Sequence, residues 1–600
     1  HNLLFVNQGL DDINIPHYQE KASEYGLDLI GFGTQATFFD YDLDGDLDFF
    51  QLNHSVHQNG TFGRRSNFIG KKHPLAGDRF FENVAGKFIE QSDEIGIYQN
   101  ALGYGLGVST ADINLDGYPD LYVGNDFHEN DYLYINQKNN TFKDELSQRI
   151  SHTSRFTMGV DIADLNHDIF PEITSLDMLP FDNEILKRSE GEDTFYNFEF
   201  KLKQGYDYQF ARNSLQLNNG TGHFSEIAMY SGISATDWSW SSLFDDFNND
   251  GEPDLFISNG IAKRMNDTDY INFVSGEEIQ KKIKERNFDE SDASLSDLIP
   301  EIKIPNKVYI NGGELLFEDA ESRIANDKAS FSNGAVSVDL DNDGDLDLVT
   351  NNINAPAYIY ENKSLSVSNL LKIKLTGSQK NKNALGTKVV VFANGIKYYK
   401  EKFPVRGFQS SAEVPLIFAT KSAIDSLWVI WPDNTYQTIH KPLNDSLIHA
   451  EFDSKLPLFD YKWLRGKTDK KFFDVTSSTF DEKPVHVENK FNEFDREALI
   501  PFKMSSEGPA ATTGDLNGDG LMDLFLGGSR KIKSQVFYQN EDGKMIAQRH
   551  ITFENDSLYE DVDALILDVN NDNFNDVIIL SAGNEYLAKS EFNSPRLYLN

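Results

Sequence analysis

A nine-residue acidic loop recurs seven times along the chain, and this repeat constrains the fold more than any other feature. In its most regular copy, residues 339–347, acidic side chains stand at positions 1, 3, 5 and 9 and glycine at position 6. Alternate spacing in a tight loop turns several carboxylates toward one point, where they repel one another unless a cation is bound. Calcium takes about six to eight oxygen ligands from carboxylates, amides, backbone carbonyls and water. The repeat therefore predicts calcium loops.

The predicted calcium ligands include the residue at position 7 of six loops, because calcium also accepts backbone carbonyls. By loop, from the first to the seventh, they are Asp40, Asp42, Asp44, Asp46 and Asp48; Asp112, Asn114, Asp116, Tyr118 and Asp120; Asp164, Asn166, Asp168 and Glu172; Asp246, Asn248, Asp250, Glu252 and Asp254; Asp339, Asp341, Asp343, Asp345 and Asp347; Asp515, Asn517, Asp519, Leu521 and Asp523; Asp568, Asn570, Asp572, Phe574 and Asp576.

The third and seventh loops depart from the pattern at position 6. Glycine adopts the positive φ of a sharp bend without strain, and asparagine is its best substitute. The seventh loop has Asn573 there, but the third has Ile169. We therefore expect the third loop to be empty or to bind calcium most weakly. The alternative for all seven is a set of solvated acidic turns without metal.

The segments around the loops predict short strands. An apolar alternation follows each acidic loop, another short apolar run precedes it, and an aromatic strand ending in asparagine, such as 132–136, comes next. Four short strands per repeat is the content of one β-propeller blade. The loops are spaced by 72, 52, 82, 93, 176 and 53 residues, so the longer intervals hold insertions. Residues 181–206 and 267–299 have helical character and predict either caps on the propeller or a binding surface.

The 176-residue interval contains a different domain. From residue 370 to 452 the acidic loops stop and alternating strands predict a small β-sandwich or barrel. We therefore expect an all-β chain with four parts: a first propeller at 1–362, a β domain at 363–452, a linker at 453–471 and the start of a second propeller at 472–600. The first residues and the last have the same strand pattern, which predicts a fragment cut within repeats.

Composition excludes several functions. The formal net charge is −40, and 26 of the 95 acidic residues lie in the seven loops, so much of the acidity belongs to the predicted sites. This charge argues against binding to nucleic acid, which needs a basic surface. The absence of cysteine excludes disulfides and thiol catalysis. No apolar run approaches the length of about eighteen residues needed for a membrane span, and no signal peptide is present.

The loops and flanking strands resemble the FG-GAP/VCBS repeats that also occur in integrin α-subunit propellers. Residues 384–431, including Gly407-Phe-Gln-Ser-Ser and Asp425-Ser-Leu-Trp-Val-Ile-Trp-Pro-Asp, resemble the ASPIC/UnbV domain. That domain accompanies such repeats in cartilage acidic protein and in large exported proteins of Bacteroidota, whose Asp-Met-Leu-Pro and Asp-Trp-Ser-Trp motifs resemble residues 177–180 and 237–240. The resemblance implies calcium, export and about five of seven blades in the first propeller. It transfers no biochemical activity.

Three further motifs have competing interpretations. Residues 103–107 are glycine-rich but lead into a strand, which argues against a nucleotide loop. His54 and His57 lack a third metal ligand and are better explained as a polar pair. Trp238 and Trp240 alternate on a predicted strand, so they point to opposite faces; packing between blades and a sugar-stacking platform both remain open.

We expect a non-enzymatic function. The sequence indicates a calcium-stabilised, exported propeller scaffold that binds a protein or polysaccharide at the cell surface through loops and helical insertions. The alternative is a propeller-based polysaccharide lyase or glycoside hydrolase, although no acidic catalytic pair can be singled out among 95 carboxylates.

Overall fold

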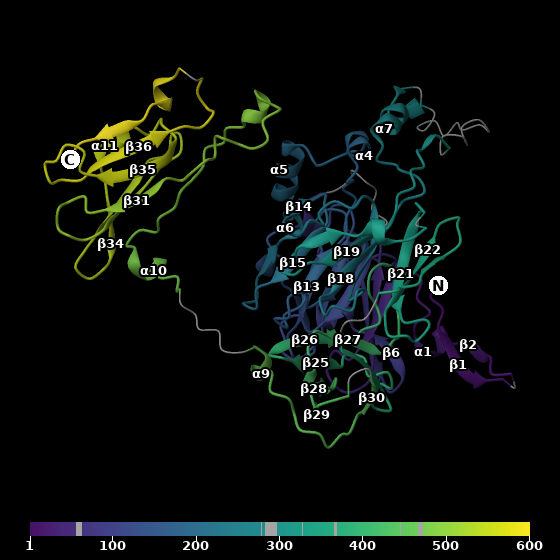
Figure 1. The fold of residues 1–600 in the computed structure, drawn as a ribbon. Coiled ribbons are helices and arrows are strands. Elements are labelled where there is room, and N and C mark those ends of the chain that lie inside the picture. Colours follow the sequence, from purple (N-terminus) through teal and green to yellow (C-terminus); the bar gives the residue numbers. More distant parts are fainter. Residues whose placement is uncertain are drawn as a thin grey trace. The chain divides into compact units, whose positions relative to one another are not determined.

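The computed structural model describes residues 1–600 except 12, 56–62, 278, 282–296, 327, 365–368, 444–445, 466–471 and 588. The chain divides into two compact units, His1–Lys467 and Thr468–Asn600 (Figure 1). Both consist mainly of short antiparallel strands. None of the helices in the described part of the chain has the length and apolar content needed to cross a bilayer.

Five of the antiparallel sheets in the first unit correspond to the predicted blades. Four have four strands and the fifth has three. They are β3 (Gly33–Phe39), β4 (Asp48–Asn53), β5 (Arg79–Val84) and β6 (Lys87–Glu90); β7 (Gly105–Ala111), β8 (Asp120–Asn125), β9 (Tyr132–Asn136) and β10 (Phe142–Asp144); β12 (Val160–Ala163), β13 (Glu172–Ser175), β15 (Ser214–Asn218) and β16 (Phe224–Glu226); β17 (Ser239–Asp245), β18 (Asp254–Asn259), β19 (Lys307–Asn311) and β20 (Phe317–Asp319); β21 (Ser332–Val338), β22 (Asp347–Asn352) and β23 (Tyr358–Tyr360).

Each acidic loop connects the first strand of a blade to the second, as the sequence predicts. In the first four blades the second strand is buried along its whole length, and because successive side chains point to opposite sides of a strand, it is packed on both faces. In β8, Leu121 and Val123 pack with Phe50 of the preceding blade, whereas Tyr122 packs with Ile173 of the following one. Alternate apolar residues therefore join each blade to its two neighbours.

The first strands pack side by side in the order β3, β7, β12, β17, β21. Within this part of the described chain, β21 and β3, at the two ends of the series, do not pack against each other in that way. An additional hairpin, β1 (Phe5–Leu10) with β2 (Pro16–Glu20), and a parallel pair, β11 (Thr153–Ser154) with β14 (Gln209–Phe210), complete the β-structure of this part. Of the residues predicted to form the first strand, 2–7, residues 5–7 lie in β1, which extends to Leu10.

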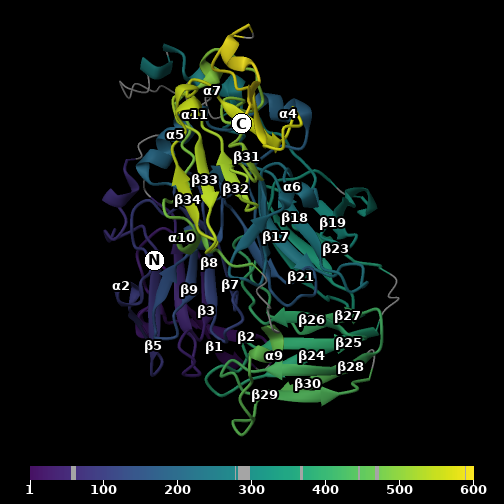
Figure 2. The ribbon, with the colours of Figure 1, turned by 90° about the vertical axis from the view of Figure 1, so that its left-hand side faces the viewer.

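Helices occur in two settings. Single turns follow the outer strands: α1 (Ala22–Tyr25), α2 (Ser92–Ile95), α3 (Leu146–Arg149) and α6 (Ala228–Ser231). The predicted insertions contain α4 (Asn183–Arg188), α5 (Phe195–Gln204) and α7 (Thr268–Val274). Most of the helix expected at 277–286 lies outside the described residues. In Figures 1 and 2, α4, α5 and α7 lie at the opposite end of the blades from strands β24–β30.

Those seven strands form a two-sheet sandwich within the first unit. One sheet is β26-β25-β28-β29 and the other is β27-β24-β30, in which β24 and β30 run parallel. Their bounds are β24 (Asn369–Thr376), β25 (Lys388–Ala393), β26 (Ile396–Glu401), β27 (Leu416–Thr420), β28 (Ile424–Ile430), β29 (Tyr436–His440) and β30 (Ser446–Glu451). Ile373, Val391, Leu427 and Trp431 are buried between the sheets. Part of the segment predicted as a linker, including α9 (Lys462–Arg465), packs against this sandwich through Phe459 and Leu464.

The second unit contains one four-stranded and one three-stranded antiparallel sheet. Their strands are β31 (Ala511–Gly514), β32 (Asp523–Leu526), β33 (Gln535–Gln539) and β34 (Met545–Gln548), followed by β35 (Asp561–Leu567), β36 (Asp576–Ser581) and β37 (Arg596–Tyr598). Two short helices, α10 (Thr476–Thr479) and α11 (Ile551–Asn555), accompany them. The sixth and seventh acidic loops again join the first and second strand of each sheet.

Candidate metal loops and the interface they form

All seven acidic loops share one backbone shape. Position 6 has a positive φ in every loop, including +75° at Ile169 and +73° at Asn573. Position 4 also has a positive φ in every loop, which the sequence analysis did not predict. The sequence does contain an indication of this second bend: position 4 is asparagine at 249, 342 and 571 and glycine at 518, the residues that adopt a positive φ most readily. The two left-handed residues turn the chain so that position 1 faces the bend.

The carboxylates at positions 1 and 9 hold this shape through backbone hydrogen bonds. In the first loop, the Gly45 N–H donates to Asp40 Oδ2 at 2.9 Å and the Tyr41 N–H donates to Asp48 Oδ2 at 3.3 Å. The bond from position 2 to position 9 is present in all seven loops. The acidic residues at these two positions therefore shape the loop as well as offering ligand oxygens.

The carboxylates also lie where a negative charge is unfavourable. Burial raises the pKa of Asp40 to about 7 and that of Asp48 to about 8, and nearby carboxylates add to both shifts. Burial likewise raises the pKa of Asp254 in the fourth loop to about 8. A buried carboxyl group of this kind is stabilised either by a proton or by a nearby cation. The loops thus have the electrostatic character of cation sites.

Ligand atoms converge most closely in two loops. Oxygens of Asp40, Asp42 and Asp48, and those of Asp339, Asp341 and Asp343, lie within 4.8 Å of one another and could hold a metal ion. Several predicted ligand oxygens are buried without a hydrogen-bond partner: Asp40 Oδ1, Asn114 Oδ1, Asp164 Oδ1, Glu172 Oε1, Asp339 Oδ1 and Asp345 Oδ1. Unsatisfied buried oxygens of this kind fit a cation such as calcium.

The other predicted residues are arranged less tightly. The second, third, fourth, sixth and seventh loops have asparagine at position 3, and in them the structure brings together no group of three carboxylates among the described residues. Asp44 is exposed, whereas Asp112, Asp120 and Asp254 are fully buried. In the second unit Asp519 and Asp572 are exposed. The seven loops therefore share a backbone but differ in how far they are enclosed.

A recurring asparagine, noted in the sequence only as part of a strand signature, links neighbouring blades. The Asn136 side-chain amide donates to the carbonyl of Tyr41 in the preceding loop at 2.8 Å. Asn218 and Asn600 donate in the same way to Ile113 and Leu516, at 3.0 and 2.8 Å. The asparagine at the end of the third strand thus connects its blade to the acidic loop of the previous one.

The sandwich of β24–β30 covers the side of the first unit that carries the first five loops, which we call the loop face. Lysines of the sandwich reach four of these loops. The Lys380 Nζ lies 3.1 Å from Asp46, the Lys388 Nζ 3.4 Å from Asp112 and the Lys421 Nζ 2.9 Å from Glu252. Lys372 pairs with Asp339. In the third loop, His167 packs against the Tyr398 ring at 4.6 Å between centroids.

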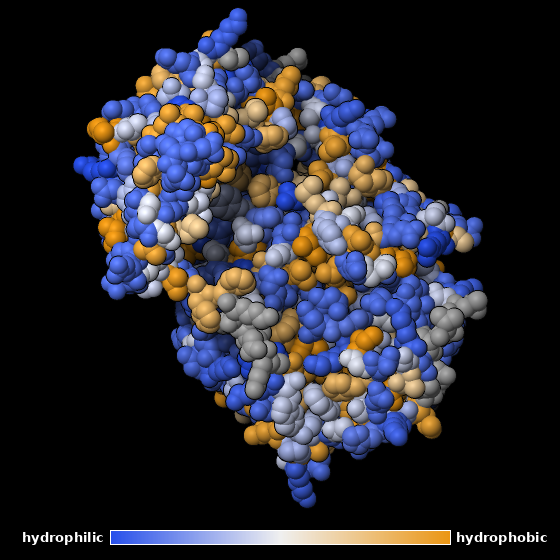
Figure 3. All heavy atoms as spheres, turned by 60° about the vertical axis from the view of Figure 1, so that its left-hand side comes forward, coloured by the Kyte–Doolittle hydropathy of each residue, from blue (hydrophilic) through white to orange (hydrophobic). Residues whose placement is uncertain are grey.

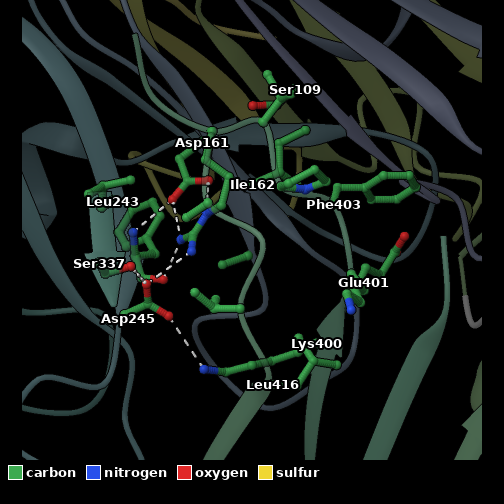
Figure 4. A pocket seen from close by; sticks show the side chains of 18 of the residues that line it. Ser109, Asp161, Ile162, Leu243, Asp245, Ser337, Lys400, Glu401, Phe403 and Leu416 are labelled. Atoms are coloured by element: carbon green, nitrogen blue, oxygen red, sulfur yellow. Dashed lines mark hydrogen bonds and ion pairs between the residues drawn. The ribbon is translucent and has the colours of Figure 1, made fainter. Parts of the chain in front are cut away.

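Between β26 and β27 a loop of the sandwich, residues 403–411, inserts between the first strands of the blades. We call this segment the plug. Arg406 donates to both oxygens of Asp161 at 2.9 and 2.7 Å and to Asp245 at 3.0 Å. Burial disfavours the charged form of Asp245, but the nearby Arg406 and Lys400 outweigh this effect and lower the pKa of Asp245. Figure 4 shows Asp161, Asp245 and Ser337, from three different blades, converging around this ion-pair network.

The tip of the plug reaches the opposite end of the first strands. Gly407 pairs with Val160 through backbone hydrogen bonds, and the Phe408 ring lies 4.6 Å from that of Trp240. A side chain at position 407 would collide with the Ser241 hydroxyl at 2.1 Å, so glycine is required for this insertion. The Trp240 indole donates to the Gly260 carbonyl at 2.7 Å, which favours packing over an exposed sugar platform.

The two remaining motifs have structural explanations. A side chain at Gly107 would lie 2.6 Å from the carbonyl oxygen of Met158, so this glycine permits close packing between β7 and β12. His54 stacks between Phe32 and Tyr104, with ring centroids 4.9 and 5.1 Å away. His57 lies outside the described residues.

Comparison with known families agrees with this division. The profile described as ASPIC and UnbV matches residues 377–454, and the FG-GAP-like repeat profile matches residues 77–174 and 206–257. The chain contains FG-GAP-like repeats and an ASPIC/UnbV domain. The second, third and fourth acidic loops therefore fall within matched FG-GAP-like repeats, and the sandwich with its plug is the ASPIC/UnbV domain.

Other comparisons add less. No curated protein matches the chain. Among solved structures, a lectin from Agrocybe aegerita, described as recognising non-reducing terminal N-acetylglucosamine, is 14% identical over 70% of this chain and 95% of its own, with a TM-score of 0.24. At this distance the match says nothing about which ligand these FG-GAP-like repeats bind.

Proposed function

We propose that this chain is a calcium-stabilised, exported scaffold that binds a protein or polysaccharide through the face opposite its metal loops. One observation carries the proposal: the ASPIC/UnbV domain covers the loop face and contacts all five loops there, so that face is an internal interface. The face with the helical insertions is left for a ligand. Export is proposed from the resemblance to exported proteins.

The opposite face contains a groove of about 790 Å³ at the tip of the plug. Its lining includes Trp240, Met265, Asn351, Ile353 and Gln409, which combine apolar surface with amide groups. Met265 is 58% exposed and Ile353 38% exposed. On the side of the molecule drawn in Figure 3, hydrophobic residues lie in small groups among hydrophilic ones.

The proposed binding of calcium can be tested by removing the ion with a chelator. One filled site stabilises the fold by about 2.7 kcal/mol at a hundredfold excess of calcium over Kd, provided the unfolded chain does not bind the ion. EDTA should therefore lower the melting temperature by several degrees, and elemental analysis should find bound calcium. An unchanged melting curve together with no bound metal would contradict this part of the proposal.

Ligand binding is tested with a panel of polysaccharides and candidate protein partners. Met265→Asp should weaken binding at least tenfold because it places a charge in the groove, whereas Met229→Asp, at another exposed methionine, on α6, should not. Binding without product supports a scaffold. Release of sugar products with turnover would instead establish a propeller-based lyase or hydrolase.

A further inference from the structure

The second loop is enclosed by the ASPIC/UnbV domain more completely than the first. Lys388, the first residue of β25, places its Nζ 3.4 Å from Asp112 Oδ2, and the two side chains are 4% and 0% exposed. The Asp112 backbone N–H donates to both oxygens of Glu401 at 3.1 Å. The ammonium of Lys388 therefore lies inside the interface, against the carboxylate at position 1.

The bend of this loop is also covered. A side chain at Gly117 would lie 2.8 Å from atoms of Asn434 and Tyr461, so the ASPIC/UnbV domain packs directly on it. The Tyr461 hydroxyl donates to Asn434 Oδ1 at 2.6 Å, and the Lys388 Nζ lies 5.6 Å from the centre of the Tyr461 ring. A lysine in this position cannot move to solvent without separating the domain from the loop.

The charges of the second loop are partly offset by the protein. Within the described chain, its carboxylates Asp112, Asp116 and Asp120 and the adjacent Glu401 face two ammonium groups, because Lys138 lies 3.2 Å from Asp116 and Lys388 lies beside Asp112. Two ammonium groups carry the charge of one calcium ion. The first loop differs, since its five aspartates face Lys380, which is 56% exposed and contacts Asp44 and Asp46 rather than position 1.

We propose that Lys388 takes the place of calcium in the second loop, so that this loop is held by an internal cation, whereas the first loop, whose lysine does not contact position 1, binds the metal. This inference rests on the proposed function in one respect: it takes the ion that Lys388 replaces to be calcium. The ligand set itself is retained, because Asn114 Oδ1 is buried without a hydrogen-bond partner. Removing the ammonium should therefore create a calcium site.

The experiment measures bound calcium per chain by equilibrium dialysis and native mass spectrometry on the whole 600-residue chain. Lys388→Met should bind one more calcium ion than the unmodified protein. Lys380→Met is the matched control, since it removes a lysine of the same domain that does not contact position 1, and it should leave the number unchanged. Equal calcium content in Lys388→Met and the unmodified chain would overturn the proposal.

A second pair of variants keeps the test valid if Lys388→Met does not fold. Asp112→Asn should leave the calcium content unchanged, whereas Asp40→Asn should lower it by one ion. Loss of an ion in Asp112→Asn would show that the second loop binds calcium and would overturn the inference alone. No loss in Asp40→Asn would instead contradict calcium binding at the first loop, which belongs to the proposed function.

Discussion

Ile169 occupies a backbone position that glycine holds in five of the other loops. Its φ of +75° lies in the left-handed region, which costs a branched residue about 1–3 kcal/mol. Its side chain, however, is buried with Leu115, Val390 and Tyr399, so it joins two loops to the ASPIC/UnbV domain. Packing with another domain offsets the local strain, and a rule based on backbone preference alone could not predict that. Weak calcium binding by the third loop stays a prediction.

Replacing Ile169 with glycine should therefore destabilise the chain. Strain relief of about 1–3 kcal/mol is outweighed by the loss of a buried aliphatic side chain, which costs about 2–5 kcal/mol. We expect the free energy of unfolding, measured in urea, to fall by about 1–2 kcal/mol.

Asn573→Gly provides the control, because Asn573 has a φ of +73° at the same loop position but is exposed. It should change stability by less than about 1 kcal/mol. A clear gain in stability for Ile169→Gly would show that strain dominates at this position.

The carboxyl groups of the first loop predict a pH dependence. Burial raises the pKa of Asp40 to about 7 and of Asp48 to about 8. A carboxyl group with a raised pKa in the folded state stabilises that state below its unfolded pKa of about 4, and this contribution is lost as the pH rises through 7 to 8. Without calcium, the first unit should thus be more stable at pH 5 than at pH 8.

Calcium should reverse this trend because it replaces the proton on these groups. The increase in melting temperature on adding calcium should be several degrees larger at pH 8 than at pH 5, as measured by calorimetry with and without EDTA. An equal increase at the two pH values would show that the buried carboxyl groups are not the calcium ligands.

The plug is the element that ties the blades to the ASPIC/UnbV domain. Arg406→Met would leave Asp161 and Asp245 buried without their main partner, and breaking a buried ion pair costs about 3–5 kcal/mol. Urea unfolding should detect a loss of that size. Lys421→Met, which removes an ion pair with a 55% exposed lysine, should cost no more than about 1 kcal/mol. Similar effects of the two substitutions would argue that the plug contributes little to docking.

The sequence predicted elements better than it predicted the contacts between them. Loop spacing and strand alternation located the blades, and the second strands are buried as expected for blades that pack in series. The plug could not be predicted, because Gly407, Phe408 and Gln409 form no periodic pattern and their role depends on distant residues such as Val160 and Trp240. Lys388 likewise looks like an ordinary strand residue until its partner Asp112 is known.

Across the whole molecule, the acidic loops serve two purposes. Each loop joins strands within a blade, and the first five also form the surface on which the ASPIC/UnbV domain rests. The negative charge of these loops is thereby partly compensated by lysines from a different part of the chain. Contacts with lysines of the docked domain therefore reduce the repulsion between loop carboxylates, which is the same effect that a bound cation would have.

The plug also has a consequence for folding kinetics. Arg406 and Asp161 are separated by 245 residues, whereas the hairpins of each blade join residues that are close in sequence. Contacts between residues so far apart in the sequence form late, because the entropic cost of closing a long loop must be overcome before the contact stabilises the folded chain. The blades are therefore expected to form before the plug inserts between their first strands. Until the ASPIC/UnbV domain, which follows the five blades in the chain, has been synthesised and has inserted its loop, the acidic turns lack the lysines that contact them in the folded chain.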